Sequence, residues 1–210
     1  MKDVREEYRG RSLEERDLLA DPLEQARLWV EEAIAADLPL ANAMTLATAT
    51  ADGHPSARTV LLKGIEEGGF TFFSHYDSRK GEEMEANPWV SLVMFWAPFD
   101  RQLIVTGRVE RIPAQASRVY FASRPRGSQL SAVISPQSRP ARREQLEQDM
   151  ARLAERYPEG ETIPMPETWG GYRILPNEIQ FWHGRPSRLH DRFQYLKREE
   201  GGWDRQRLAP

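Results

Sequence analysis

Two basic residues enclose the stretch of this sequence whose residue types are best suited to chemistry. Arg58 and Lys63 stand at the ends of a β-branched and aliphatic run that is typical of a strand. Residues 70–74 alternate aromatic side chains with Thr71, and we expect a second strand there, paired with the first across a turn at residues 67–69. Because side chains alternate along a strand, Arg58 and Lys63 face opposite sides and can serve different ligands.

A helix is expected directly after these strands, and its first turn carries two cations. Asp77 or Ser78 can cap this helix, and the Asn-Pro pair at residues 87–88 ends it. The amide groups of a helix N-terminus attract anions, whereas cations there are unfavourable unless an anion is bound. Two interpretations are therefore open for Arg79 and Lys80: a phosphate site, or two solvated basic side chains on a surface turn.

The composition is that of an ordinary globular chain and excludes several function classes. Its 210 residues, 40% hydrophobic and 29% charged, are enough for one sizeable domain. A net charge of -3 gives no electrostatic case for nucleic acid or a membrane surface as the main partner. Cysteine is absent, which excludes disulfides, a thiol nucleophile and thiolate metal sites. Without a signal peptide or a long apolar run, the chain is expected in the cytoplasm.

We expect a mainly β protein with flanking helices, built as a single domain over residues 21–210. Residues 1–20 are polar and charged, and we expect a mobile arm there with Tyr8 and Leu13 as its only anchors. Strands are expected at residues 43–50, 57–62, 69–73, 89–96, 101–111, 171–175, 178–182, 193–197 and 203–208. Helices are expected to begin at Asp21-Pro22, to span residues 114–123, and to run from Ser138 to Tyr157, with a long loop at residues 126–137. Sequential strands joined by short turns predict an antiparallel sheet closed into a barrel.

A second group of chemically suitable residues lies between two expected strands. If residues 188–192 are extended, Arg188, His190 and Arg192 share one face, because side chains alternate. Two guanidinium groups beside an imidazole would bind an anionic ligand and exchange a proton near neutral pH. The alternative is a surface strand in which Asp191 and neighbouring acids neutralise the arginines.

The remaining histidines, His54, His75 and His183, are expected at turns or on the surface. Histidine binds metals together with other histidines or carboxylates at characteristic spacings. The sequence offers no such pair, and we predict no metal site.

A third group of polar residues lies on the end of the helix at residues 114–123 and on the loop that follows. It comprises Arg118, Tyr120, Arg124, Arg126 and Ser128. Tyr120 and Arg124 are four residues apart and hence neighbours on one helix face. If this group converges with Lys63, it makes a second phosphate site, whereas the alternative for Tyr120 is a core aromatic.

Taken together, these motifs resemble those of the pyridoxine/pyridoxamine 5'-phosphate oxidases. The resemblance runs from about Tyr8 to the last four residues, and it preserves order and spacing. The motifs that carry it are residues 58–63, 78–80, 87–88, 101–102, 120–126, 137–138, 169–171, 181–182 and 188–192. One departure is Phe73, which stands where a Tyr is common in the family.

The resemblance implies a split antiparallel β-barrel that forms a homodimer with two FMN molecules at the interface. By position, FMN would be held by Arg58, Thr59, Val60, Leu61, Phe73, Ser74, Arg79, Lys80, Gln102, Gln137, Ser138, Trp182 and Arg192. The substrate phosphate would be held by Lys63, Tyr120, Arg124 and Ser128. Arg188, Leu189 and His190 would lie at the pyridine ring, and Arg5 and Tyr8 would close the site.

The reaction implied by the resemblance is the oxidation of pyridoxine 5'-phosphate and pyridoxamine 5'-phosphate to pyridoxal 5'-phosphate. The flavin would take a hydride from the C4' carbon and pass the electrons to O2, giving H2O2. Arg188 would position the substrate and stabilise charge, and His190 would orient ring substituents or assist proton movement. Two alternatives remain: a related flavin oxidase of phenazine biosynthesis, against which the expected second phosphate site argues, and a non-catalytic flavin-binding barrel.

Overall fold

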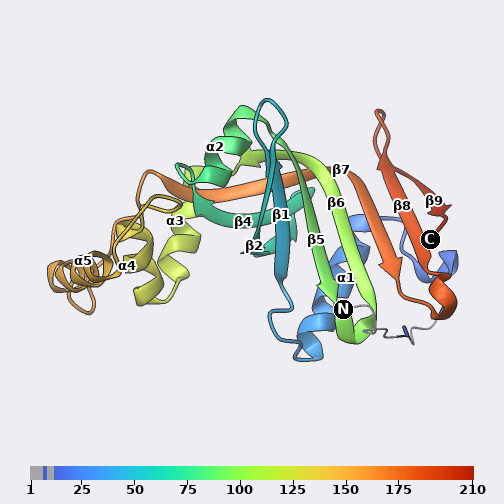
Figure 1. The fold of residues 1–210 in the computed structure, drawn as a ribbon, viewed down its shortest axis with the longest axis horizontal. Helices are drawn as coiled ribbons and strands as arrows, with labels where there is room; N and C mark the ends of the chain where they lie inside the picture. Colours follow the sequence, from blue (N-terminus) through green and yellow to red (C-terminus); the bar gives the residue numbers. More distant parts are fainter. Residues whose placement is uncertain (1–6, 9–11) are drawn as a thin grey trace.

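The computed structural model describes residues 7–8 and 12–210, and its nine strands form one curled antiparallel sheet (Figure 1). The strands are β1 (Ala43–Ala49), β2 (Pro55–Leu61), β3 (Gly64–Glu66), β4 (Gly69–His75), β5 (Trp89–Trp96), β6 (Arg101–Arg111), β7 (Trp169–His183), β8 (Asp191–Lys197) and β9 (Trp203–Leu208). The α-helices are α1 (Pro22–Ala35), α2 (Arg79–Ala86), α3 (Ala114–Ser123), α4 (Arg126–Ile134) and α5 (Arg143–Arg156). The expected mainly β architecture with flanking helices is confirmed.

The long strand β7 organises the sheet. Along one edge it pairs with β6, and along the other its first half pairs with β4 and its second half with β8. The strand order is β2-β1-β5-β6-β7-β4-β3, and β9 pairs with β8. Gly171 therefore lies opposite Phe73, while Trp182 lies opposite Arg192 on the far part of the same strand.

The prediction of two separate strands at residues 171–175 and 178–182 was wrong, because β7 continues through Pro176. Proline has no amide hydrogen to donate to a neighbouring strand, so it is tolerated in a sheet mainly at edges and bulges. Here the register of β6 against β7 shifts between Thr106 and Gly107, opposite Pro176. This irregularity lets the strand pass the proline without ending.

The predicted pairing of the Arg58 strand with residues 70–74 was also wrong. Strand β2 pairs with β1, while the short β3 pairs with β4 across a turn at Glu67 and Gly68, which have φ of 49° and 80°. The chain leaves β2 where the amide of Leu62 donates to the carbonyl of Asn42 at 2.8 Å. β2 is consequently an edge strand of the sheet, and one of its sides faces the helices.

Helix α1 covers one side of the sheet and completes the main core. Asp21 caps it, since its side chain accepts a hydrogen bond from the amide of Leu23 at 2.8 Å, and Pro22 is its first residue. On its buried face, Trp29 packs edge-on against Phe181 of β7 with ring centroids 5.0 Å apart. The side chains of α1 thereby fix the part of β7 that precedes Trp182.

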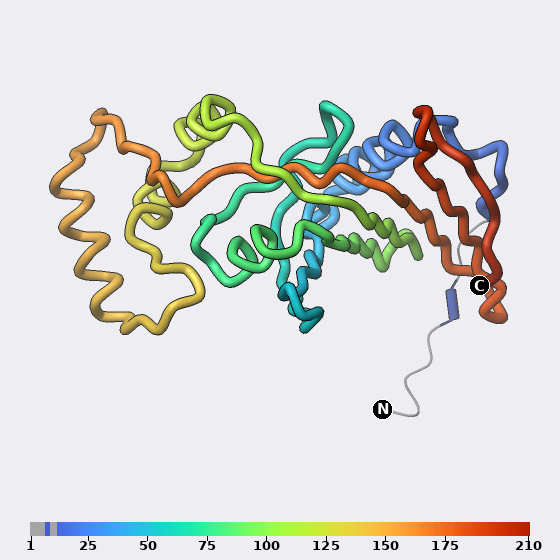
Figure 2. Tube along the Cα trace, turned by 90° about the horizontal axis from the view of Figure 1, so that it is seen from above, coloured from blue at the N-terminus to red at the C-terminus, as the bar shows by residue number. Residues whose placement is uncertain are grey.

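A second, smaller core lies at the opposite end of the molecule, where α3, α4 and α5 gather beside the start of β7 (Figure 2). It contains the buried side chains of Phe121, Leu130, Ala132, Ile163 and Trp169. Trp169 is the first residue of β7, so this core attaches the three helices to the sheet.

Two helix boundaries differ from the expectations. Residues 126–137 were expected to be a loop, but residues 126–134 form α4, because the burial of Leu130 and Ala132 in this second core outweighs the low helix propensity of serine and glycine. Helix α5 begins at Arg143 rather than at Ser138. Ser138 has a left-handed φ of 72°, and Pro140 disfavours a helical conformation in the residue before it.

The close approach of β6 and β7 at the bulge makes a testable prediction. A Cβ atom at Gly107 would overlap the carbonyl oxygen of Leu175 and lie 2.8 Å from the Cα of Pro176. We expect Gly107→Ala to lower the free energy of unfolding by about 1–3 kcal/mol in urea denaturation. The control is Gly127→Ala, because a Cβ there meets no atom within 4 Å. Equal stability of the two variants would contradict the close approach.

Candidate functional site

One cavity brings together most of the residues singled out in the sequence. It has a volume of about 800 Å³ and lies between β2, β4, α2, α3 and α4. Of the residues expected to hold FMN, it is lined by residues 58–61, Phe73, Ser74, Arg79, Lys80, Gln137 and Ser138. All four residues expected at the substrate phosphate also line it: Lys63, Tyr120, Arg124 and Ser128. The predicted convergence of Lys63 with the third polar group is therefore confirmed for Tyr120, Arg124 and Ser128.

Lys80 is a buried cation whose hydrogen-bond partners are all neutral. It is 6% exposed, and its Nζ donates to Ser74 Oγ at 2.9 Å, Ser78 Oγ at 3.0 Å and Gln137 Oε1 at 2.7 Å. Burial lowers the pKa of Lys80 to about 8, and the nearby charge of Arg58 lowers it as well. In the described part of the chain no carboxylate pairs with this ammonium group. A bound anion would supply the missing charge.

Helix α2 places Lys80 at this position. Ser78 caps the helix and Arg79 is its first residue, as expected, and Asn87 is the C-cap. A Cβ at Gly81 would overlap the carbonyl oxygen of Tyr76, so the first turn packs directly on the end of β4. The first turn of α2 therefore opens onto the same cavity as β2 and β4.

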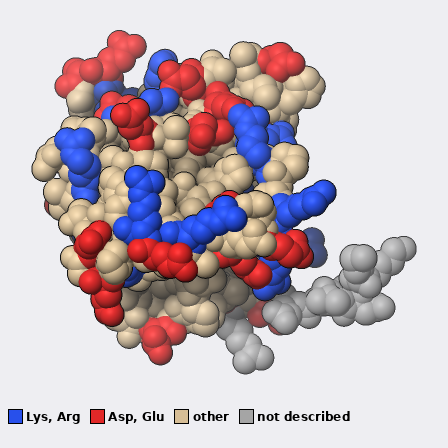
Figure 3. Space-filling model, turned by 90° about the vertical axis from the view of Figure 1, so that its left-hand side faces the viewer, with Lys and Arg blue, Asp and Glu red and all other residues tan. Residues whose placement is uncertain are grey.

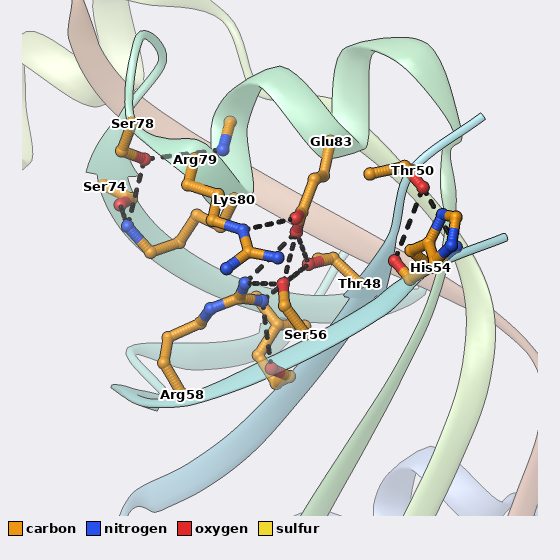
Figure 4. A network of polar contacts seen from close by, with 12 residues as sticks. Thr48, Thr50, His54, Ser56, Arg58, Ser74, Ser78, Arg79, Lys80 and Glu83 are labelled. Atoms are coloured by element: carbon orange, nitrogen blue, oxygen red, sulfur yellow. Dashed lines mark hydrogen bonds and ion pairs between the residues drawn. The ribbon is translucent and has the colours of Figure 1, made fainter. Parts of the chain in front are cut away.

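Glu83 connects Arg58 and Arg79, two of the arginines that line the cavity, as Figure 4 shows. Its carboxylate accepts hydrogen bonds from Arg79 Nε at 2.8 Å and from Arg58 Nη2 at 3.2 Å. The hydroxyl groups of Thr48 and Ser56 also donate to it. Burial alone would raise the pKa of Glu83, but these four hydrogen-bond donors together lower it to about 2. Glu83 is consequently ionised at neutral pH.

Arg124 carries a donor without a partner. Among the described residues nothing accepts a hydrogen bond from its buried Nη1. The guanidinium lies over the ring of Trp169, 4.8 Å from the centroid, and burial lowers the pKa of Arg124 while Tyr120 raises it. Buried polar groups are normally hydrogen-bonded, so this nitrogen marks a place for an acceptor.

An aromatic stack forms one wall of the cavity. The rings of Phe73 and Tyr120 are 3.8 Å apart at an angle of 17°, and Trp169 stacks on Phe73 with centroids 5.4 Å apart. Tyr120 thus combines both interpretations: it packs as an aromatic residue and lines the cavity. Two other members of the third polar group lie elsewhere: Arg118 donates to Gln115, and Arg126 to backbone carbonyls of residues 157–161.

Seven of the remaining predicted residues lie away from this cavity, and we call this enlarged set the second group. Gln102, Trp182 and Arg192 stand side by side on β6, β7 and β8. Tyr8 packs edge-on against the rings of Trp182 and His190, with centroid distances of 5.3 and 5.2 Å. Leu189 and Arg188 lie in the preceding loop and are exposed. Arg5 lies outside the described residues.

The expectation of an extended segment at residues 188–192 was wrong for its first part. Pro186–Arg188 form a 3₁₀ turn in which Ser187 and Arg188 have left-handed φ of 56° and 59°, and β8 begins only at Asp191. His190 is held by its Nδ1, which accepts a hydrogen bond from the amide of Arg185 at 3.1 Å. In a neutral imidazole this leaves the proton on Nε2.

Asp191 anchors the end of the loop that precedes β8. Its buried carboxylate accepts hydrogen bonds from the amide of Leu13 at 2.9 Å, from Arg185 at 3.2 Å and from Arg207 at 2.5 Å. Asp191 therefore does neutralise arginines, but they are Arg185 and Arg207 rather than those of its own motif. Arg192 instead donates to Gln180 and to the carbonyl of Ala209.

The cavity and the second group lie on different parts of β7. Gly171 pairs with Phe73 at the cavity, and Trp182 belongs to the second group. Eleven residues of strand separate them, which corresponds to about 36 Å along β7. In Figures 1 and 2, α2, α3 and α4 accordingly lie far from β8 and β9. A nucleotide-sized ligand cannot contact both groups of one protomer.

Several residues of the site escaped the sequence analysis. His75 and His183 were expected at turns or on the surface, but they are only 6% and 8% exposed. His75 is the last residue of β4, which pairs with β7, and His183 is the last residue of β7, which pairs with β6 and β8. His75 and Trp169 both line the cavity, and the alternation from Phe73 to His75 was a signal for the first. The Arg79–Glu83 pair had a signal in its i, i+4 spacing. His54 is exposed in a turn, as expected.

The described residues also bear on metal sites, membrane spans and surface charge. Residues 7–8 and 12–210 contain no group of three or more His, Cys, Asp or Glu side chains that could hold a metal ion. No helix in the described part of the chain has the length and apolar character needed to cross a membrane. The face that carries the three-helix end of the molecule shows basic and acidic side chains interspersed (Figure 3). Positive charge is therefore not concentrated on that face.

The buried Lys80 makes the stability of the ligand-free protein depend on pH. Its pKa is about 8 in the folded state and near 10.5 in the unfolded chain, so between these values the unfolded state binds more protons. The unfolding free energy should therefore rise from pH 8 to 10.5. We expect this rise in the wild type relative to Lys80→Met, measured by urea unfolding of flavin-free protein. A difference that stays constant over this range would contradict the lowered pKa.

Comparison with known proteins assigns the chain to a family. Residues 30–157 match the family described as pyridoxamine 5'-phosphate oxidase, and residues 169–210 match the pyridoxine 5'-phosphate oxidase C-terminal dimerisation region. A pyridoxine/pyridoxamine 5'-phosphate oxidase of Alcanivorax borkumensis is 65% identical over 210 residues, covering 100% of both chains. One of the same name from Synechocystis is 50% identical and covers 99% of this chain and 97% of its own.

Solved structures agree with this fold. PhzG from Burkholderia lata, in complex with tetrahydrophenazine-1-carboxylic acid, superposes with a TM-score of 0.89 at 28% identity, covering 96% of this chain and 99% of its own. A pyridoxamine 5'-phosphate oxidase-related, FMN-binding protein from Nostoc punctiforme has a TM-score of 0.75 at 17% identity, covering 92% and 100%, and shares the fold. The matched regions and full-length identities lead to one conclusion: the chain belongs to the pyridoxine/pyridoxamine 5'-phosphate oxidase family.

Proposed function

We propose that this protein is an FMN-dependent oxidase that converts pyridoxine 5'-phosphate and pyridoxamine 5'-phosphate to pyridoxal 5'-phosphate, with O2 as electron acceptor and H2O2 as product. The observation that carries the proposal is the presence of two separate anion positions in one cavity. Lys80 is buried without a carboxylate partner, and Arg124 has a buried nitrogen without an acceptor. A cofactor phosphate and a substrate phosphate would occupy these two positions.

The residues at the first position fit the phosphate of FMN. Lys80 and the two arginines that Glu83 connects surround the first turn of α2, whose amide groups also favour an anion. Ser74, Gln137 and Ser138 add neutral hydrogen-bonding groups. When bound, FMN supplies the hydride acceptor and transfers the electrons to O2.

The residues at the second position bind and orient the substrate. Lys63, Arg124 and Ser128 offer donors to the substrate phosphate, and Tyr120 places its ring beside them. Holding the phosphate fixes the distance and orientation of the carbon to be oxidised. The same contacts explain why a phosphorylated vitamer is the expected substrate.

In this proposal, the second group of a partner protomer completes the site. Within one chain, Trp182 lies about 36 Å along β7 from the cavity, and Arg188 and His190 follow in the loop after that strand, so they cannot share its ligand. The match of residues 169–210 to a dimerisation region supports a homodimer, and we infer that each second group faces the other protomer's cavity in it. Arg188 would then position the pyridine ring, and His190, with its proton on Nε2, would donate a hydrogen bond to a ring substituent.

The alternatives have less support. PhzG is 28% identical to this chain, whereas two pyridoxine/pyridoxamine 5'-phosphate oxidases are 65% and 50% identical over nearly full length. The cluster of Lys63, Tyr120, Arg124 and Ser128 would have no purpose in a barrel that only stores flavin.

The direct test is an anaerobic titration of the purified protein with pyridoxine 5'-phosphate, followed by the visible absorbance of the flavin. We expect the absorbance to bleach and to recover when air is admitted. Unphosphorylated pyridoxine is the control and should bleach the flavin only at much higher concentration, because it lacks the group that the second position binds. A flavin spectrum that never bleaches with the phosphorylated vitamer would overturn the proposed reaction.

The shared site is tested by mixing two inactive variants. Lys80→Ala alters the cavity and His190→Ala alters the second group. A hybrid dimer of the two has one site built from unmodified residues of both protomers, so co-expression with separate affinity tags should restore activity in the doubly tagged fraction. If each site lies within one protomer, that fraction stays as inactive as the parents.

A further inference from the structure

We propose that Glu83 is a positioning residue of the anion site: it holds the guanidinium groups of Arg58 and Arg79 in the orientation that receives a phosphate dianion. The identity of that ligand rests on the proposed function, whereas the arrangement of the three side chains is independent of it. Glu83 does not line the cavity, so it acts on the ligand only through its two partners.

The first observation is the geometry of the network. Glu83 accepts hydrogen bonds from Arg58 of β2 and from Arg79 of its own helix. Both arginines line the cavity. Figure 4 shows both guanidinium groups directed at the carboxylate of Glu83. The hydroxyl groups of Thr48 and Ser56 hold Glu83 Oε2, and Arg58 donates to both of these residues as well. The carboxylate has little freedom left to rotate.

The second observation is that Arg79 depends on Glu83 for its order. The Arg79 side chain is 63% exposed, whereas that of Glu83 is 5% exposed. A long exposed side chain loses considerable rotamer entropy when it is fixed, and that cost falls on ligand binding unless the free protein has already ordered it. The hydrogen bond to buried Glu83 is the only one recorded for the Arg79 side chain among the described residues. Glu83 therefore pre-organises Arg79.

The third observation is the charge balance. Arg58, Arg79 and Lys80 bring three positive charges, and Glu83 compensates one of them. The two charges that remain match a phosphate monoester, which is mostly a dianion at neutral pH because its second pKa is about 6. If charge were the only role of Glu83, its removal would make the site more positive and strengthen binding of the anion. If it positions the arginines, its removal weakens binding in spite of the added positive charge.

The experiment measures the affinity of flavin-stripped, full-length protein for FMN and for riboflavin, which lacks the phosphate, by flavin fluorescence. The variants are Glu83→Ala, Glu83→Gln and, as control on the same helix, Glu85→Ala, whose carboxylate pairs with Arg111 at the surface. We expect Glu83→Ala to lower FMN affinity by about 10- to 100-fold, as for the loss of one or two charge-assisted hydrogen bonds, with riboflavin affinity unchanged. Glu83→Gln, which keeps one acceptor oxygen, should show an intermediate loss, and Glu85→Ala none.

Each other outcome is decisive. Tighter FMN binding by Glu83→Ala and Glu83→Gln would reduce Glu83 to a charge-balancing role and overturn the proposal. Equal losses for FMN and riboflavin would show a purely structural role, and they would overturn it as well. A wild-type protein that binds FMN no better than riboflavin would refute the proposed cofactor site itself, which separates that failure from a failure of the role of Glu83.

Discussion

The cost of burying positive charge is the constraint on which the rest of the site depends. An ammonium group removed from water is penalised by several kcal/mol unless an opposite charge accompanies it, and Lys80 has only neutral partners. The protein reduces the penalty by surrounding Nζ with three oxygen acceptors, and Glu83 takes part of the charge of the neighbouring arginines. The residual imbalance is what an anion relieves. Relief of this charge imbalance therefore contributes favourably to the free energy of anion binding.

Elements from distant parts of the sequence come together at the end of β4 and form the site that carries this charge. The capped helix α2 starts directly on that strand, because Gly81 allows its first turn to touch the carbonyl of Tyr76. The edge strand β2 adds Arg58, and the small core around Trp169 holds α3 and α4 against the other side. Of the three helices at that end of the sheet, α3 and α4 enclose the cavity, and α5 packs against α4.

Local signals explain which parts the sequence could predict. Helix α2 was predictable because each of its ends has a local signal, the cap Ser78 at the start and the Asn-Pro pair at residues 87–88 at the end. The turn between β1 and β2 likewise has its own Asp-Gly signal. Helix α4 was not, because its serine and glycine content favours a loop and only the burial of Leu130 in the second core overrides that preference. The cations of the site were visible from residue type and spacing. The separation of Trp182 from the cavity was not, because it depends on β7 running unbroken through Pro176, which a bulge in β7 itself permits at Asn177, the residue left out of the register with β6.

The loop before β8 also contains an unfavourable feature. In the cavity this feature is buried positive charge, and in the loop it is backbone strain. Two consecutive residues other than glycine, Ser187 and Arg188, have left-handed φ, and such conformations cost about 1–3 kcal/mol each unless the surroundings impose them. Asp191 anchors the loop through Arg185, and the amide of Arg185 in turn binds His190. The anchored loop presents Arg188 and Leu189, the latter 69% exposed, to solvent. The hydrogen bonds of Asp191 and His190 with Arg185 thus hold the two strained residues in place from within the protomer.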